Sequence, residues 1–241
     1  MTEHDILAVT QAIQVTLSTE QALSLLQFRD LLALWNERFN LTALTDDASI
    51  LQLHFADSLT LVPVIQGLER ETPFNVIDIG TGGGFPGIPL KIVLPYVHMT
   101  LTDGTAKKLQ FCEEVIRTLQ LNTIHTVHGR AEEMAHQPAH RERYDLVVAR
   151  AVAPMPTLAE YLLPFAKVGG HVIAMKGSDA HAEAQQALGA LNTLGGELIR
   201  IVDVKLPNRD DKRALILVRK SRPTPRLYPR QAGGPRKNPL R

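Results

Sequence analysis

The chain has 241 residues, of which 44% are hydrophobic and 21% charged. This balance is typical of a globular domain with a sizeable core, and it excludes collagen-like, coiled-coil and disordered proteins. No apolar run approaches the about 20 residues that span a bilayer, and the N-terminus lacks the pattern of a signal peptide. We therefore expect a cytoplasmic protein with no membrane partner. A single cysteine, Cys112, excludes an internal disulfide and a zinc site built from several thiolates.

The net charge of +1 conceals an uneven distribution. Residues 221–241 hold six of the 26 basic residues and none of the 25 acidic ones, so a body of charge −5 carries a tail of charge +6. The tail cations are Arg222, Arg226, Arg230, Arg236, Lys237 and Arg241. Frequent prolines and the pair Gly233 and Gly234 predict that the tail is extended or disordered.

Helical patterns fill the first 70 residues. Apolar residues recur at steps of three and four from Leu25 to Phe39, and a second helical pattern covers about 47–66, with Thr45 and Asp46 as candidate N-caps. From residue 74 short apolar runs alternate with helical patterns. The expected strands are 74–79, 96–101, 123–128, 144–149 and 170–175, and the expected helices are 86–94, 105–120, 156–166 and 179–194.

Strands separated by helices predict an α/β fold with a doubly wound, Rossmann-like parallel sheet. Two further strands, 197–205 and 213–220, are joined without a helix and predict an antiparallel hairpin at the end of that sheet. The expected organisation is an N-terminal helical segment (1–70) packed on the core, an α/β domain (71–220) and the basic tail (221–241).

The most specific segment is the glycine-rich loop after the first strand, which reads Asp78-Ile-Gly80-Thr-Gly82-Gly-Gly84-Phe85-Pro-Gly87. Glycines at these places let the backbone turn sharply and approach a ligand closely. Gly82, Gly84 and Gly87 satisfy the dinucleotide pattern. An acid before the first glycine, as Asp78 is, suits S-adenosylmethionine instead. Both ligands, and a tight turn without a ligand, remain open at this point.

Two carboxylates follow later strands. Asp103 closes the second strand, where an acid accepts hydrogen bonds from ribose hydroxyls in either cofactor; a helix N-cap is the alternative. Glu132 follows the third strand, where a bound adenine would lie in a doubly wound sheet, although a solvated helix residue would also read this way. His54 and Asp57 lie one helical turn apart and favour a structural pair over catalysis; no third ligand near them suggests a metal.

The resemblance to a known family rests on Asp78–Leu90, together with Asn40-Leu-Thr, His54-Phe-Ala-Asp-Ser, Ala149-Arg-Ala and Met175-Lys-Gly. These motifs resemble the bacterial small-subunit ribosomal RNA methyltransferase G family, also called glucose-inhibited division protein B, over about 20–220. Gly83 departs from the alanine or proline expected there. The resemblance implies methyl transfer from S-adenosylmethionine to N7 of one guanosine in 16S rRNA, free or within a small ribosomal subunit or assembly intermediate, and we expect a monomer.

The resemblance also implies the cofactor contacts. They are Gly80, Phe85, Ala131, Glu132 and Arg150, with Asp103 on the ribose and with Asp78, Gly82 and Gly84 shaping the loop. Guanine N7 is a lone pair that gains a methyl group without losing a proton, so no general base is needed and none is assigned. Cytosine C5 would need a cysteine nucleophile, but Cys112 lies on an apolar helix face and is expected in the core.

Candidate RNA contacts follow the fourth and fifth strands. Arg150 and Lys176 are expected at the carboxyl edge of the sheet, where Arg150 could contact the cofactor or the base and Lys176 a phosphate. The alternatives are a surface arginine and a solvated lysine. The basic tail favours contact with RNA phosphates, with Tyr228 able to stack on a base, against a merely solubilising terminus.

Two rival functions remain. An NAD-dependent oxidoreductase would use Gly82, Gly84, Gly87 and Asp103, but the chain lacks a His or Tyr-Lys set for hydride and proton transfer. A non-catalytic RNA-binding module would have no need of the glycine loop and Asp103. The sequence therefore favours an rRNA methyltransferase.

Overall fold

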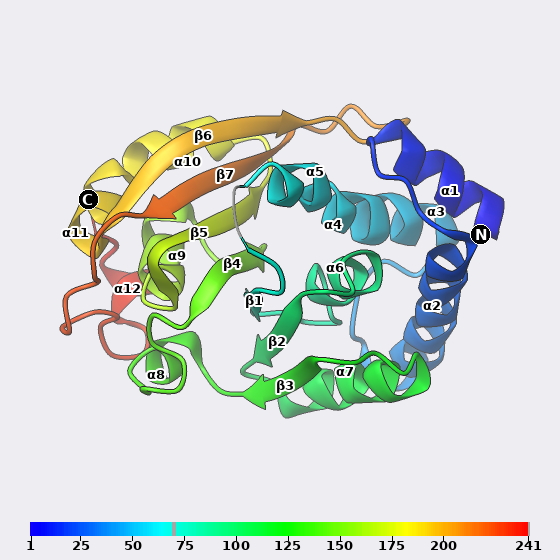
Figure 1. The fold of residues 1–241 in the computed structure, drawn as a ribbon, viewed down its shortest axis with the longest axis horizontal. Coiled ribbons are helices and arrows are strands. Elements are labelled where there is room, and N and C mark those ends of the chain that lie inside the picture. The colour runs from blue at the N-terminus through cyan, green and yellow to red at the C-terminus, as the bar shows by residue number, and fades with distance from the viewer. Residues whose placement is uncertain (69–70, 241) are drawn as a thin grey trace. The chain divides into compact units, whose positions relative to one another are not determined.

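The computed structural model describes residues 1–68 and 71–240, which form two compact units built from interleaved segments (Figure 1). The first unit comprises 1–73, 81–128 and 205–210, and the second comprises 74–80, 129–204 and 211–241. The division differs from the three segments expected from sequence: the N-terminal helices share a unit with 81–128, and the tail belongs to the second unit. Arg241, one of the tail cations, lies outside the described residues.

The first unit is mainly helical. Its elements are α1 (Glu3–Ala12), α2 (Thr19–Phe39), α3 (Asp47–Ser49), the π-helix η1 (Ile50–Ala56), α4 (Asp57–Leu59), α5 (Leu61–Gln66), α6 (Gly87–Val93), α7 (Ala106–Thr118), and the strands β2 (His98–Asp103) and β3 (Ile124–His128). The two strands pair in parallel. Of the two candidate N-caps, Asp46 is the one used, because its Oδ1 accepts the Ser49 N–H at 2.8 Å.

The stretch 47–66 corrects an expectation about membranes. It forms a continuous helical run of 20 residues with a mean hydropathy of 1.4, which by length and composition alone is enough to cross a membrane. The expectation that no apolar run approaches this length is therefore wrong. However, 72% of its apolar window is buried inside the protein. Burial of this kind is what a core helix also shows, and Phe55 and Leu59 are fully buried here.

The second unit contains five strands in the order β1-β4-β5-β7-β6. Its elements are β1 (Asn75–Ile79), α8 (Ala131–Met134), β4 (Tyr144–Arg150), α9 (Met155–Leu162), β5 (Ala166–Lys176), α10 (Ala180–Gln186), α11 (Leu188–Leu194), β6 (Gly196–Val204), β7 (Arg213–Lys220) and α12 (Gly234–Lys237). β1, β4 and β5 run parallel, while β7 pairs antiparallel with β5 and β6. The expected parallel strands and terminal hairpin are confirmed. The expected helix 179–194 is instead two helices, and the short helices α8 and α12 were not expected.

The tail, expected to be extended or disordered, is a mostly irregular segment with one short helix, and it packs on the second unit. Figure 1 shows it leaving β7 and carrying α12 beside α9. Side chains of the second unit satisfy its backbone: the Arg141 guanidinium donates to the carbonyls of Thr224 and Tyr228 at 2.8 and 2.9 Å. Glu160, fully buried on α9, accepts from the Arg230 guanidinium at 2.7 Å. Paired backbone groups let an irregular segment pack without losing hydrogen bonds.

A buried lysine stands where β7 meets the tail. The Lys220 side chain is fully buried, and its ammonium donates to the Leu163 carbonyl at 2.6 Å and to the Thr224 hydroxyl. Glu142 Oε1 lies 3.2 Å away. Burial lowers the pKa of Lys220 to about 8, because removing water disfavours the charged form more than Glu142 favours it.

This pKa predicts a stability gain at high pH. Between pH 8 and 10.5 the unfolded chain holds the Lys220 proton while the folded chain releases it, so the free energy of unfolding rises with pH in this window, by up to about 3 kcal/mol. Urea unfolding at pH 7 to 10.5 should therefore show the wild type gaining stability relative to Lys220→Met. Exposed Lys212→Met is the control and should track the wild type. Parallel profiles for the wild type and Lys220→Met would contradict the lowered pKa.

Candidate functional site

The glycine loop in the first unit is held by the Asp103 carboxylate at the end of β2. Asp103 Oδ2 accepts the Gly82 N–H at 3.0 Å, and Oδ1 accepts the Thr105 N–H at 2.8 Å. The Thr81 N–H donates to the Thr102 carbonyl at 2.8 Å. The residue at the N-cap of α7 is Thr105, so Asp103 is not the cap. One carboxylate thus ties the loop to the start of α7.

The conformation of the loop favours glycine at Gly82. Its φ is +59°, which L side chains rarely adopt, and a Cβ atom there would meet no atom within 4 Å. This face of the loop is therefore open. A glycine with open space beside it, next to a carboxylate that can still accept hydrogen bonds, fits a ligand that carries hydroxyl groups and approaches the backbone closely.

Phe85 packs into an aromatic cluster built from the N-terminal helices. Its ring stacks on His54 with centroids 4.3 Å apart and on Phe28 at 5.0 Å, and only 4% of Phe85 is exposed. His54 Nε2 lies 2.9 Å from the Thr42 hydroxyl oxygen. The Phe85 ring therefore holds the loop in place. Because the Phe85 ring is buried among other rings, a ligand could contact Phe85 mainly through its backbone atoms.

Cys112 packs beneath the same loop. It is fully buried on α7, and its sulfur lies 3.7 Å from the Gly82 carbonyl oxygen. The expectation that Cys112 belongs to the core is confirmed.

The second unit holds the other candidate cofactor residues. Asp78 is fully buried on β1, in register with Val148 of β4. Gly80 follows β1 with φ +73°, and a Cβ atom there would come within 2.9 Å of Val152, so the segment after β4 approaches too closely for a side chain. Arg150 is the half-buried last residue of β4, in register with Met175 of β5. Asp78, Gly80 and Arg150 thus come at the carboxyl ends of neighbouring parallel strands, where ligands bind in open α/β sheets.

The Glu132 side chain is buried and hydrogen-bonded within the protein. It lies in the single turn of α8, directly after Ala131, and is 8% exposed. Its Oε1 accepts the Gly233 N–H of the tail at 3.3 Å. Burial, reinforced by the nearby Glu132 carboxylate, raises the pKa of the Tyr161 hydroxyl. The alternative of a solvated helix residue is therefore wrong, and Glu132 links α8 to the tail.

Lys176 ends β5, at the edge of the sheet where it was expected, but its side chain is engaged inside the protein. Its ammonium pairs with Glu183 at 2.7 Å and donates to the Ala153 carbonyl at 2.8 Å, and its side chain is only 10% exposed. Glu183 also accepts the Met155 N–H at the start of α9, at 2.6 Å. Because two of its three donors are used inside the protein, Lys176 stabilises the turn after β4.

The sequence analysis did not identify three residues that contact the candidate site residues. Thr105 and Gly233 act through backbone N–H groups, which carry no residue-type signal. Tyr161 lies on α9 and reaches Glu132 across 29 positions of sequence, which no local pattern reveals.

Comparison with known proteins identifies the family of this chain. The GidB family, described as rRNA small subunit methyltransferase G, matches residues 21–213. A ribosomal RNA small subunit methyltransferase G from Acetivibrio thermocellus is 47% identical over 94% of this chain and 91% of the relative. The protein of the same name from Leuconostoc mesenteroides is 42% identical over the whole of both chains.

Solved structures show the fold. Geranyl diphosphate C-methyltransferase from Streptomyces coelicolor, solved with S-adenosyl-L-homocysteine, has a TM-score of 0.55 at 14% identity, covering 80% of this chain and 98% of its own. TrmN from Thermus thermophilus has a TM-score of 0.52 at 16% identity, covering 70% and 53%. The Rossmann-like α/β prediction is thereby confirmed. With its glycine loop and Asp103 in place and its sequence matched over most of its length, this chain belongs to the rRNA small subunit methyltransferase G family.

Proposed function

We propose that this chain transfers a methyl group from S-adenosyl-L-methionine to N7 of a guanosine in 16S rRNA. The observation that carries the proposal is the glycine loop, whose open face at Gly82 adjoins the anchored Asp103 carboxylate, in a chain of this family. An NAD-dependent oxidoreductase would require hydride-transfer residues that the chain lacks.

The proposed cofactor residues divide by the groups they offer. Asp103 offers carboxylate lone pairs to the ribose hydroxyls, and Gly80 and Phe85 offer backbone. Ala131 and Glu132 offer the first N–H groups of α8, because the Glu132 carboxylate is used by Gly233. Asp78, Gly82 and Gly84 shape the loop. Arg150 remains the candidate contact with the base or the cofactor.

The chemistry asks little of the side chains beyond alignment. When bound, the cofactor supplies a methyl group already activated by its positive sulfur. Guanine N7 attacks with its own lone pair and loses no proton, so the chain needs no general base. The task of the protein is to hold the loop rigid and to offer donors or a flat guanidinium to the guanine. Arg150, at the end of β4, suits the O6 atom of that base.

The first experiment tests the reaction. Incubated with labelled S-adenosyl-L-methionine and small ribosomal subunits from a strain lacking this methylation, the protein should place label on guanine N7 of 16S rRNA. Free 16S rRNA and partly assembled particles, assayed in parallel, distinguish the accepted substrate. Gel filtration of the active protein tests the expected monomer. Label on another base or atom would contradict the proposal.

Removal of the Asp103 carboxylate should weaken cofactor binding. Asp103→Ala loses the acceptors for the ribose hydroxyls and releases Gly82, so the dissociation constant for S-adenosyl-L-methionine should rise about tenfold or more by calorimetry. Exposed Glu133→Ala should bind as the wild type does. NAD titrated in parallel should produce no binding heat. Unchanged affinity in Asp103→Ala would remove Asp103 from the site.

Two glycines give a matched test of the loop. Gly82 and Gly169 both have positive φ, +59° and +88°, and neither has an atom within 4 Å of a Cβ position. Alanine at either position should therefore cost a similar amount of stability, about 1–2 kcal/mol. Only Gly82→Ala should also lower cofactor affinity, because its methyl group enters the proposed ligand space. Equal cofactor affinities in the two variants would show that the Gly82 face is not used.

A further inference from the structure

The cations of the tail fall into two groups. Arg230 is directed into the protein, where it pairs with the buried Glu160 at 2.7 Å. Arg222 donates to the carbonyl and side-chain oxygens of Asn192 at 2.7 and 2.8 Å. Arg222 is exposed as well, although Asn192 holds its guanidinium. Arg226, Arg236 and Lys237 are also exposed to solvent. We call these last three the outer cations.

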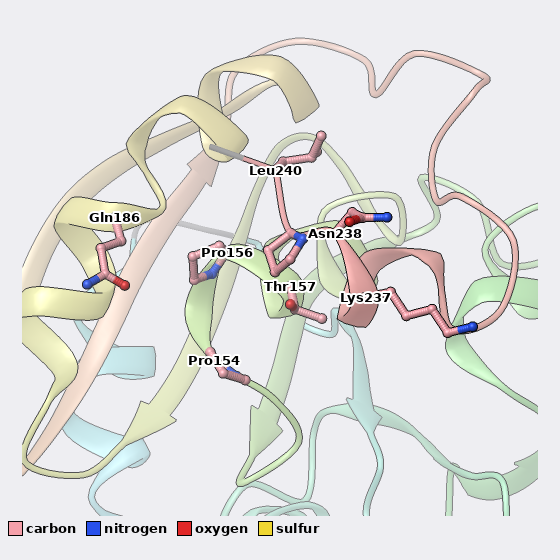
Figure 2. A pocket seen from close by; sticks show the side chains of 8 residues that line it. Pro154, Pro156, Thr157, Gln186, Lys237, Asn238 and Leu240 are labelled. Carbon is pink, nitrogen blue, oxygen red and sulfur yellow. The ribbon is translucent and has the colours of Figure 1, made fainter.

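Two of the outer cations, Arg226 and Lys237, line hollows in the second unit, and Arg236 directly precedes Lys237 in α12. The first hollow, of about 700 Å³, lies between the start of α9, Gln186 of α10 and the end of the tail, and Figure 2 shows Gln186 on one side of it with Lys237 and Asn238 on the other. The second, of about 740 Å³, is lined by Arg226, Arg230 and His136 among others. Lys237 lines both hollows, so they adjoin at this residue, and we call the two hollows together the strip.

The described residues that line the strip include cations but no acidic side chain. Glu160 holds Arg230, Glu142 holds Lys220 and the Thr224 N–H, and Glu132 accepts the Gly233 N–H. The lining of the two hollows therefore holds Arg226 and Lys237 and, among the described residues, no carboxylate, which favours an anionic partner.

The lining suits a nucleic-acid strand better than a small anion. Pro154, Pro156 and Pro239 offer apolar surfaces, while Gln186 and Asn238 offer amide groups that both donate and accept hydrogen bonds. Pro154 lies four residues after Arg150, within the segment that follows β4. Phosphates spaced along a backbone match cations spaced along a strip, whereas a single free anion would engage only one of them.

We propose that the outer cations bind backbone phosphates of the rRNA substrate, with the two hollows receiving the strand that flanks the methylated guanosine. The inference rests on the proposed function for the identity of the RNA. The inward cations and Arg141 hold the tail in place, so the outer cations are arranged before RNA arrives. Each phosphate neutralised releases counterions, which makes binding dependent on salt.

The test removes charge without removing the tail, because deletion would also free Glu132 and Glu160. Arg226→Ala, Arg236→Ala and Lys237→Ala are combined in one variant, and the matched control combines Arg200→Ala, Lys212→Ala and Arg219→Ala, three exposed cations of the same unit. Binding to 16S rRNA is measured by filter retention from about 50 to 200 mM salt, the range over which binding through phosphates weakens most clearly. Calorimetry with S-adenosyl-L-methionine and thermal unfolding accompany each variant.

The slope of log affinity against log salt should become shallower by about 0.7 for each phosphate that the protein no longer neutralises, or about 2 in the tail variant. The Michaelis constant for RNA should rise, while cofactor affinity and melting temperature stay at wild-type values. The slope of the control should stay close to that of the wild type. If the wild type methylates RNA but the tail variant and the control have equal slopes, the proposed phosphate-binding role of the outer cations is wrong and the proposed function stands. If the wild type neither methylates nor binds 16S rRNA, both the proposed function and the proposed role of the outer cations are wrong.

Discussion

The candidate cofactor site depends on the Asp103 carboxylate, whose two oxygens accept hydrogen bonds from the backbone N–H groups of Gly82 and Thr105. Gly82 must keep its positive φ to present its N–H to Asp103, and Thr105 must begin α7 where it can reach the other oxygen. A carboxylate has about four lone-pair positions, so two donors leave capacity for ribose hydroxyls. The same side chain thus orders the loop and remains a binding group. Order established before binding reduces the entropy that a ligand must overcome.

Polar groups decide how the irregular tail folds. A segment without regular structure must find partners for its carbonyls or leave them in water, and Arg141 supplies partners for several of them. Glu160 is fully buried, and an unpaired carboxylate there would be costly, so Arg230 is required beside it. The pairing strengthens the basicity of the cation as well, because Glu160 raises the pKa of Arg230. Docking of the tail is therefore specified by a few charged side chains.

Much of the architecture could be predicted because it repeats locally. Alternating apolar runs and helical patterns indicated the parallel strands and the closing hairpin, and an acid at the end of the second strand indicated Asp103. What escaped prediction depends on partners distant in sequence. Lys176 reads as an exposed phosphate contact until Glu183 is placed against it, and the rings of Phe85 and His54 are known to stack only once the helices are packed.

The tail, which its composition predicts to be extended or disordered, depends in the same way on partners that are distant in sequence. Proline, glycine and net charge predict disorder when the segment is considered alone, because such a segment cannot bury enough apolar surface of its own. Here the contacts are supplied by Glu160, Thr157 and Arg141, which lie between 70 and 87 residues away along the chain from the tail atoms they contact. Composition predicts how a segment behaves in isolation, whereas here the tail is ordered by its contacts with other parts of the second unit.

An ordered basic tail and a disordered one would give RNA the same charge but not the same binding. A disordered segment loses conformational entropy when it settles on a partner, and this loss reduces the affinity that its charges provide. In this chain the conformational entropy of the tail is lost during folding rather than on binding, because Arg230 and Arg141 already fix the backbone that carries the outer cations. The inward and outward cations are therefore complementary: the first group makes the geometry of the second independent of RNA. The uneven charge of the sequence describes both groups, but only their contacts in the folded chain separate them.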